Sequence, residues 1–126
     1  MNKFEFKDSI KVNIAGEVVP LKIGGTVLDD SIKFGKYIQK KAKGLDKLEY
    51  KEAIKIVCDE CDKYIDSITE PGAAKRIFKN RGNDPYDRMQ VVNFLIEEIK
   101  ENKIGSFSEE KYTPNRAQRR HSKKNK

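Results

Sequence analysis

The fold class follows from residues 10–23, whose sequence is IKVNIAGEVVPLKI. Apolar side chains alternate with other residues on both sides of an Ala15-Gly16-Glu17 turn, and a period of two indicates strands with one buried face. We therefore predict an antiparallel β-hairpin over about residues 4–25. Phe4 and Phe6 alternate in the same way, which is consistent with a short leading strand. Pro20 cannot donate to a strand ladder, so the second strand is predicted to lie at a sheet edge.

Beyond the Gly24-Gly25 pair, the apolar spacing changes from the strand period to the helical one. We predict helices over about residues 28–102, the first of them over 28–43 despite a glycine at position 35. Asp84 as an N-cap and Pro85 in the first turn mark the start of the last helix. The strongest helical pattern spaces its apolar residues by three or four positions, at Tyr50, Ile54, Val57, Cys61, Tyr64 and Ile68. The expected fold class is α+β, with the hairpin packed on a small, mainly helical bundle in one domain of residues 1–104.

The positive charge is confined to one end of the chain. The sequence holds 27 Lys and Arg against 20 Asp and Glu, a formal net charge of +7. Residues 111–126 contain seven of the basic residues and no acid, so the rest of the chain is neutral. A charge run without apolar residues cannot bury surface, and residues 105–126 are therefore expected to form a disordered basic tail. Its candidate partner-binding residues are Lys111, Arg116, Arg119, Arg120, Lys123, Lys124 and Lys126.

The sequence holds no pattern typical of catalysis. The only histidine, His121, lies in the expected tail, where nothing would position it as a general base. Cys58 and Cys61 form a C-x-x-C inside a predicted helix, and the acids between them disfavour a thiolate. A structural zinc site needs about four ligands, and the body of the chain offers no histidine to add to the two thiols. We expect no enzymatic activity, no cofactor and no metal site, and we interpret the two cysteines as structural thiols.

Membranes are not an expected partner, and nucleic acid is not favoured. No apolar run approaches the length of about 20 residues that a membrane-spanning helix needs. The N-terminus lacks the apolar segment of a signal peptide, so a cytoplasmic location is expected. Tyr112 is the only aromatic residue among the tail bases, which leaves little for base stacking. The tail is then either a solubilising end or a contact arm for an acidic surface or for nucleic-acid phosphates.

Several stretches resemble one family of proteins. The hairpin residues 12–17 and the edge at 19–21 are similar to the opening of the small tail assembly chaperones of long-tailed phages and prophages of Gram-positive bacteria. Residues 64–68, followed by Pro71-Gly72 and Ile77-Phe78, look like the mid-chain helix, turn and helix of that family. Residues 115–120, with the sequence NRAQRR, resemble a common ending of its members.

The resemblance implies a role without catalysis. Such chaperones bind the tape-measure protein, keep it soluble in the host cytoplasm until tail-tube subunits assemble around it, tend to self-associate and are absent from the mature virion. In this chain an exposed apolar strip could cover the apolar seam of a client helix. The candidate residues for this client-binding or self-association face are Tyr50, Ile54, Tyr64, Val92 and Ile99.

Two other functions stay open at this point. The first alternative is a small prophage nucleic-acid-binding accessory protein that uses the basic tail, which predicts steep salt dependence. The second is a structural tail component that remains in the particle.

Overall fold

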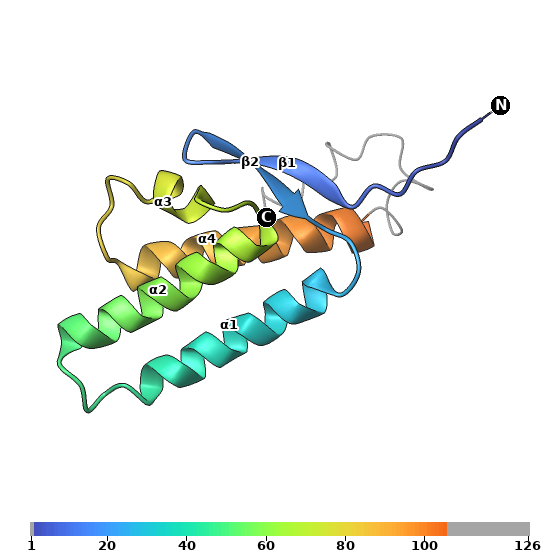
Figure 1. Ribbon diagram of the computed structural model, residues 1–126. Helices are drawn as coiled ribbons and strands as arrows, with labels where there is room; N and C mark the ends of the chain where they lie inside the picture. The colour runs from blue at the N-terminus through green and yellow to red at the C-terminus, as the bar shows by residue number, and fades with distance from the viewer. Residues whose placement is uncertain (1, 106–126) are drawn as a thin grey trace, which may run out of the picture.

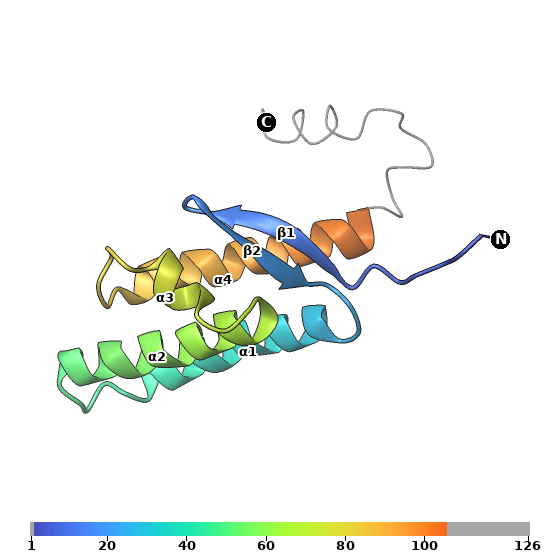
Figure 2. The ribbon, with the colours of Figure 1, turned by 45° about the horizontal axis from the view of Figure 1, so that its top comes forward.

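The structure is a computed structural model in which residues 2–105 are described. Its elements are β1 (Ser9–Ile14), β2 (Glu17–Lys22), α1 (Val27–Lys43), α2 (Tyr50–Ile68), α3 (Ala73–Ile77), α4 (Pro85–Lys100) and a π-helical turn (Glu101–Gly105). The hairpin and α1 lie on opposite sides of α2 and α4, as the two views of Figures 1 and 2 show. The predicted α+β class, a hairpin packed on a mainly helical bundle, is confirmed.

The hairpin forms where the alternation predicts it. β1 and β2 pair antiparallel, with Ile14 opposite Glu17, so Ala15 and Gly16 form a two-residue turn. Both turn residues have positive φ angles, 53° and 91°, as the type I′ turns that suit strand twist require. The amide of Gly16 also donates to the Asn13 side chain at 2.9 Å.

Pro20 occupies a position where its missing N–H removes no hydrogen bond between β1 and β2. A two-residue hairpin begins with a hydrogen-bonded pair, and such pairs alternate with non-hydrogen-bonded ones along the ladder. Lys11 and Pro20 are three pairs away from the turn pair and therefore form a non-hydrogen-bonded pair. The ring nitrogen of Pro20 thus faces away from β1, along the outer edge of β2.

The leading strand suggested by Phe4 and Phe6 is not present. Residues 2–8 form no strand, and the two rings are 76% and 81% exposed, although they contact each other edge to face at 4.9 Å. Alternation alone is not enough here, because no apolar surface of the described chain covers these rings. The paired strands cover residues 9–22 rather than the predicted 4–25.

The helices begin close to their predicted residues. Asp84 caps α4 as predicted and accepts a hydrogen bond from the Tyr86 amide at 2.9 Å. Thr26 occupies the N-cap position of α1, but its hydroxyl bonds Asp30 instead of capping the backbone. The last helix was predicted to reach about residue 102. In agreement with this prediction, α4 ends at Lys100, and the chain continues as a π-helical turn to Gly105.

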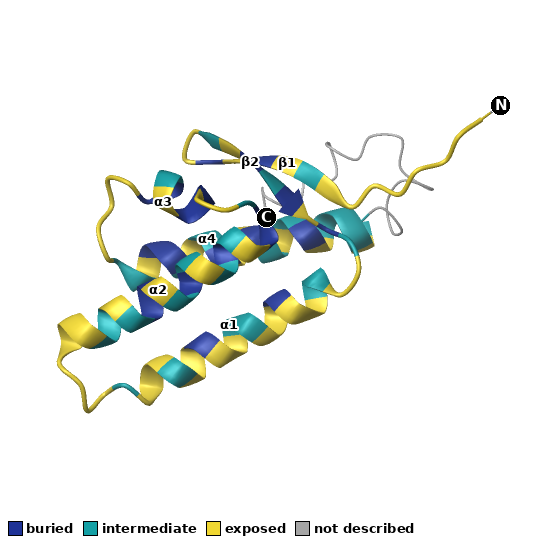
Figure 3. Cartoon of the chain, viewed as in Figure 1, coloured by how far each residue is buried: buried dark blue, intermediate teal, exposed yellow. Residues whose placement is uncertain are grey.

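The core lies between the hairpin and the helices that it covers. Figure 3 shows the buried positions concentrated on the facing sides of the hairpin, α2 and α4. The main cluster takes five residues from the hairpin region and nine from the helical part: Val12, Ile14, Val19, Leu21, Ile23, Ile65, Ile68, Ala73, Ala74, Ile77, Phe78, Val92, Leu95 and Ile99. Two lysines tie the layers together through backbone oxygens. Lys22 donates to the Ser67 carbonyl at 2.9 Å, and Lys103 donates to the Ile23 carbonyl at 2.6 Å.

The buried face of α2 is turned relative to its predicted stripe. Cys58 and Ile65 are fully buried, whereas Tyr50 at the start of the stripe is 71% exposed. α2 extends past the end of the hairpin layer (Figure 1), where the described residues that pack near it come from α1, the α1–α2 loop at Leu45 and the start of α4. The spacing of apolar residues identifies the helix but cannot show which part of it has neighbours.

Substitution of Gly35 by Ala is expected to stabilise the chain. Gly35 lies inside α1, and an added Cβ would only meet the Ile96 side chain at 4.0 Å, which is ordinary contact. Alanine restricts the unfolded chain more than glycine, so Gly35→Ala should raise the free energy of unfolding by about 0.5–1 kcal/mol in urea titrations. The same change at Gly16, whose φ is +91°, should lower it. A loss of stability in Gly35→Ala would contradict the expected packing of α1 on α4.

Candidate functional site

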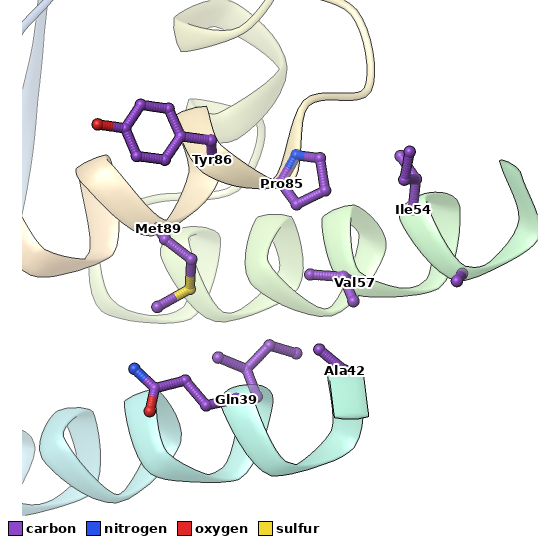
Figure 4. A pocket seen from close by; sticks show the side chains of 9 residues that line it. Gln39, Ala42, Ile54, Val57, Pro85, Tyr86 and Met89 are labelled. Atoms are coloured by element: carbon purple, nitrogen blue, oxygen red, sulfur yellow. The ribbon is translucent and has the colours of Figure 1, made fainter. Parts of the chain in front are cut away.

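An apolar hollow opens at the end of the helical bundle that the hairpin does not reach. It lies between the second half of α1, the first half of α2 and the start of α4, and its volume is about 330 Å³. Figure 4 shows the side chains of the three helices around the hollow. The lining consists of Ile38, Gln39, Ala42, Ala53, Ile54, Val57, Pro85, Tyr86 and Met89.

The hollow follows from small residues and from where α4 begins. Ala42 of α1 and Ala53 of α2 both line the hollow, where larger side chains would fill the space. α4 starts only at Pro85, so no earlier helical turn covers the first half of α2. Within residues 2–105, no charged side chain lines the hollow. The lining is therefore suited to apolar groups.

The predicted apolar face is only partly available to a partner. Ile54 lines the hollow, and Tyr50 is exposed one turn earlier on α2. Val92 and Ile99 are 1% and 0% exposed in the core, so their assignment to a contact face is corrected. Both belong to the side of α4 that packs in the main cluster, which sequence spacing alone could not separate from an exposed side.

Tyr64 is engaged within the chain. Its ring stacks on Phe34 with centroids 4.2 Å apart, and its hydroxyl shares a hydrogen bond with Ser31. Burial raises the pKa of the Tyr64 phenol. These contacts fix α1 against α2, so Tyr64 acts in the packing of the bundle rather than at its surface.

A ridge of lysines runs along α1 beside the hollow. Lys33 pairs with Asp29 at 3.0 Å, which raises the pKa of the Lys33 ammonium, and Lys41 lies 3.8 Å from Glu60. The three remaining lysines of α1 form no ion pair within the described residues 2–105. We call them the α1 ridge: Lys36, Lys40 and Lys43. All three are exposed.

Two lysines of the α1 ridge border the hollow by helix geometry. Gln39 lines the hollow, and Lys36 and Lys43 stand three residues before it and four after it, on the same side of α1. Lys40 directly follows Gln39 and points about 100° away from it around the helix, so it lies on the solvent-facing side of α1, farther from the hollow. The α4 side of the hollow, by contrast, carries the exposed ring of Tyr86 and no charge in its lining.

The two cysteines are buried and free, in agreement with their interpretation as structural thiols. Both are 0% exposed. Burial raises the pKa of Cys58, and burial, with a smaller contribution from Cys58, raises the pKa of Cys61 to about 12. Thiolates are the reactive form of cysteine, so neither side chain is a nucleophile near neutral pH.

The folded chain should therefore resist thiol reagents. A pKa of about 12 lowers the thiolate fraction of Cys61 about a thousandfold from that of an ordinary thiol at pH 8. We expect Ellman's reagent to modify neither cysteine of the native protein within minutes, and both at once in guanidinium chloride. Immediate reaction of one thiol in the native protein would contradict its buried position.

Sequence reasoning missed a buried ion pair next to the cysteines. Arg88 is 4% exposed and donates to Asp62 at 3.0 and 3.3 Å and to the Gly82 carbonyl. Its guanidinium also lies over the Phe78 ring, 4.0 Å from the centroid. Arg88 thus holds α4, α2 and the segment after α3 together. Nothing in the spacing around position 88 distinguishes it from a solvated helical arginine.

A second arginine pair lies close by. Arg81 donates to both oxygens of Asp87 at 2.9 and 3.0 Å, and these hydrogen bonds hold the pKa of Asp87 below its usual value. Asp87 also stands in the first turn of α4, where a negative charge is favourable. The pair fixes the start of α4 and so the α4 side of the hollow.

Three further features considered from the sequence are a metal site, a membrane span and the basic tail. Residues 2–105 contain no group of three or more His, Cys, Asp or Glu side chains placed to hold a metal ion. In this same part of the chain, no helix is both long and apolar enough to cross a membrane. The predicted partner-binding bases of the tail lie outside the described residues: Lys111, Arg116, Arg119, Arg120, Lys123, Lys124 and Lys126.

Comparison with known proteins identifies a family. Residues 26–123 match a family described as a family of unknown function (DUF6673). The match covers more than half of the chain and all of α1, α2 and α4, so the chain belongs to this family. It begins after the hairpin and contains every residue that lines the hollow. No curated protein and no solved structure matches the chain.

Proposed function

We propose that this member of the family is a phage or prophage tail assembly chaperone that binds the tape-measure protein and keeps it soluble, without catalysing a reaction. The observation that carries the proposal is the apolar hollow between α1, α2 and α4. A tape-measure protein is a long helical rod with exposed apolar seams, and a groove between helices is a common receptor for such a seam.

Two further features support a binding role. Tyr50 and Tyr86 are 71% and 72% exposed next to the hollow, and tyrosines are enriched at protein interfaces. The stretches quoted above also resemble the tail assembly chaperones over much of the chain. The proposed chaperone acts in the cytoplasm of the bacterial host, contacts the tape-measure protein and possible tail-tube subunits, self-associates and is absent from the mature virion.

The proposal is tested by substituting Ala42, which is exposed at the mouth of the hollow. Ala42→Trp places an indole over the hollow, and we expect it to lower recovery of the tape-measure protein by about fivefold or more. The measurement is purification of the tagged full chain from phage-producing cells at moderate and high salt, with nuclease treatment and mass spectrometry. Lys63→Trp, at an exposed position of α2 outside the hollow, is the matched control and should change nothing.

The alternative function gives a different result. The seven bases of residues 111–126 favour a nucleic-acid-binding accessory protein, whose affinity would fall steeply with salt and would not depend on Ala42. Recovery of nucleic acid or ribosomal proteins, lost at high salt or after nuclease, would contradict the chaperone proposal. Recovery of the chain with purified virions would contradict it as well.

A further inference from the structure

We propose that the hollow receives apolar side chains from an acidic amphipathic helix, whose carboxylates pair with Lys36 and Lys43 of the α1 ridge. This inference rests on the proposed function and specifies which segments of the tape-measure protein are bound. It predicts an occupant with an apolar seam and with Asp or Glu beside that seam.

The lining of the hollow argues for side chains of a protein rather than for a small molecule. Small-molecule sites of about 300–1,000 Å³ enclose most of the ligand and place a small number of polar groups that orient it. Here the volume is at the lower limit, and of the lining residues in the described part of the chain Gln39 and Tyr86 carry polar groups, with the Tyr86 ring turned away from the other lining side chains (Figure 4). A few bulky apolar side chains spaced along one helix face would fill the hollow without needing polar partners.

The charge around the hollow is asymmetric. The α1 ridge supplies Lys36 and Lys43 on either side of Gln39, and no carboxylate of residues 2–105 forms an ion pair with these lysines or with Lys40. Lys33 and Lys41 on the same helix, in contrast, have Asp29 and Glu60 as partners. The α1 ridge can therefore accept carboxylates from outside without breaking an ion pair within the described chain.

The ridge also stands at the end of α1. Lys40 and Lys43 belong to its last turn, where cations interact favourably with the helix dipole. This explains a preference for lysine there but not for Lys36, which lies in the middle of the helix. An acidic occupant would use Lys36 and Lys43 and would be oriented with its carboxylates toward α1 and its seam toward Ile54 and Met89.

The test uses two labelled synthetic peptides of about 20 residues that share one apolar seam at helical spacing. One carries Glu on both flanks of the seam and the other carries Lys. We expect fluorescence anisotropy to show binding of the Glu peptide to the full chain and weaker binding of the Lys peptide. Replacing all three ridge lysines by Glu should lower the affinity for the Glu peptide about tenfold and should raise the affinity for the Lys peptide.

Three controls keep the test specific. The triple variant Lys11→Glu, Lys75→Glu and Lys79→Glu changes the net charge equally at exposed positions away from the hollow and should have little effect. Replacing the three ridge lysines by Gln avoids placing acids at the end of α1, and circular dichroism verifies that each variant folds. The tail bases could attract the acidic peptide by themselves, so the seven tail bases are also replaced by Gln. In that background the substitution of the ridge lysines by Glu should still lower the affinity for the Glu peptide.

The inference is overturned if both peptides bind equally, if the control triple weakens binding as much as the ridge triple, or if Ala42→Trp leaves binding unchanged. It is also overturned if sedimentation shows a dimer that Ala42→Trp dissociates and that excludes the peptide, because a second copy would then fill the hollow. The two proposals fail separately. If the ridge triple still recovers the tape-measure protein fully, only this inference fails, and if the peptide binds but that protein is never recovered, only the proposed function fails.

Discussion

Deletion of residues 2–24 is expected to abolish the cooperative unfolding transition of the chain. The deleted segment carries Val12, Ile14, Val19, Leu21 and Ile23, five members of the main core cluster. Burial of each such side chain contributes about 1.5–3 kcal/mol, and the whole stability of a small domain is about 5–15 kcal/mol. The family match begins at residue 26, but the helices that it covers would then expose the apolar side of α4. Circular dichroism and thermal melts would measure the loss.

A shorter deletion provides the control. Residues 2–7 lie outside the strands, and Phe4 and Phe6 are exposed, so their removal should leave the melting temperature nearly unchanged. Leu21→Ala tests the same layer with one substitution and should cost about 2–5 kcal/mol, because Leu21 is fully buried. A sharp melt of the chain without residues 2–24 would show that the helices fold without the hairpin.

Arg88→Met is expected to lower the free energy of unfolding by about 3 kcal/mol. The substitution keeps much of the side-chain volume but leaves Asp62 without its partner and the Gly82 carbonyl without its donor. The Asp62 side chain is 31% exposed, so water can compensate it in part, and the expected cost lies at the lower end of the range for broken buried pairs. Urea titration of both proteins measures the difference.

The double variant Asp62→Leu with Arg88→Met separates the charge from the packing. If the cost comes from an unpaired carboxylate, removing that carboxylate should recover most of the lost stability. If the contacts of Arg88 with Phe78 and Gly82 dominate, the double variant should stay as unstable as the single one. Unchanged stability of Arg88→Met alone would contradict the buried position of the pair.

The parts of the fold that the sequence predicts are those set by local chemistry. The hairpin is specified by period-two alternation around a two-residue turn, and the start of α4 by Asp84 and Pro85. These signals act within a few residues, so neighbours in space are not needed to interpret them. The same alternation at Phe4 and Phe6 gives no strand, because a strand also needs a partner that local sequence does not supply.

The candidate site depends on contacts between distant segments and was only partly predictable. Ile54 lines the hollow and Tyr50 is exposed beside it, as the predicted contact face requires. Val92 and Ile99 follow the same helical spacing of apolar residues, on α4, but they lie in the core. The hollow itself requires Ala42, Ala53 and Pro85 to meet from three helices. Likewise, the partnership of Arg88 with Asp62 spans 26 residues, and no local pattern marks it.

The outward position of Pro20 limits how molecules of this protein can join through their sheets. Among residues 2–105 the hairpin pairs with no third strand. The β2 residues whose backbone N–H and C=O groups point away from β1 are Val18, Pro20 and Lys22, so the central donor of that edge is missing. Linear polymerisation through β-strands requires two complete edges on every molecule. With only the β1 edge complete, strand-to-strand addition should end at a pair of molecules and should not propagate into a fibre.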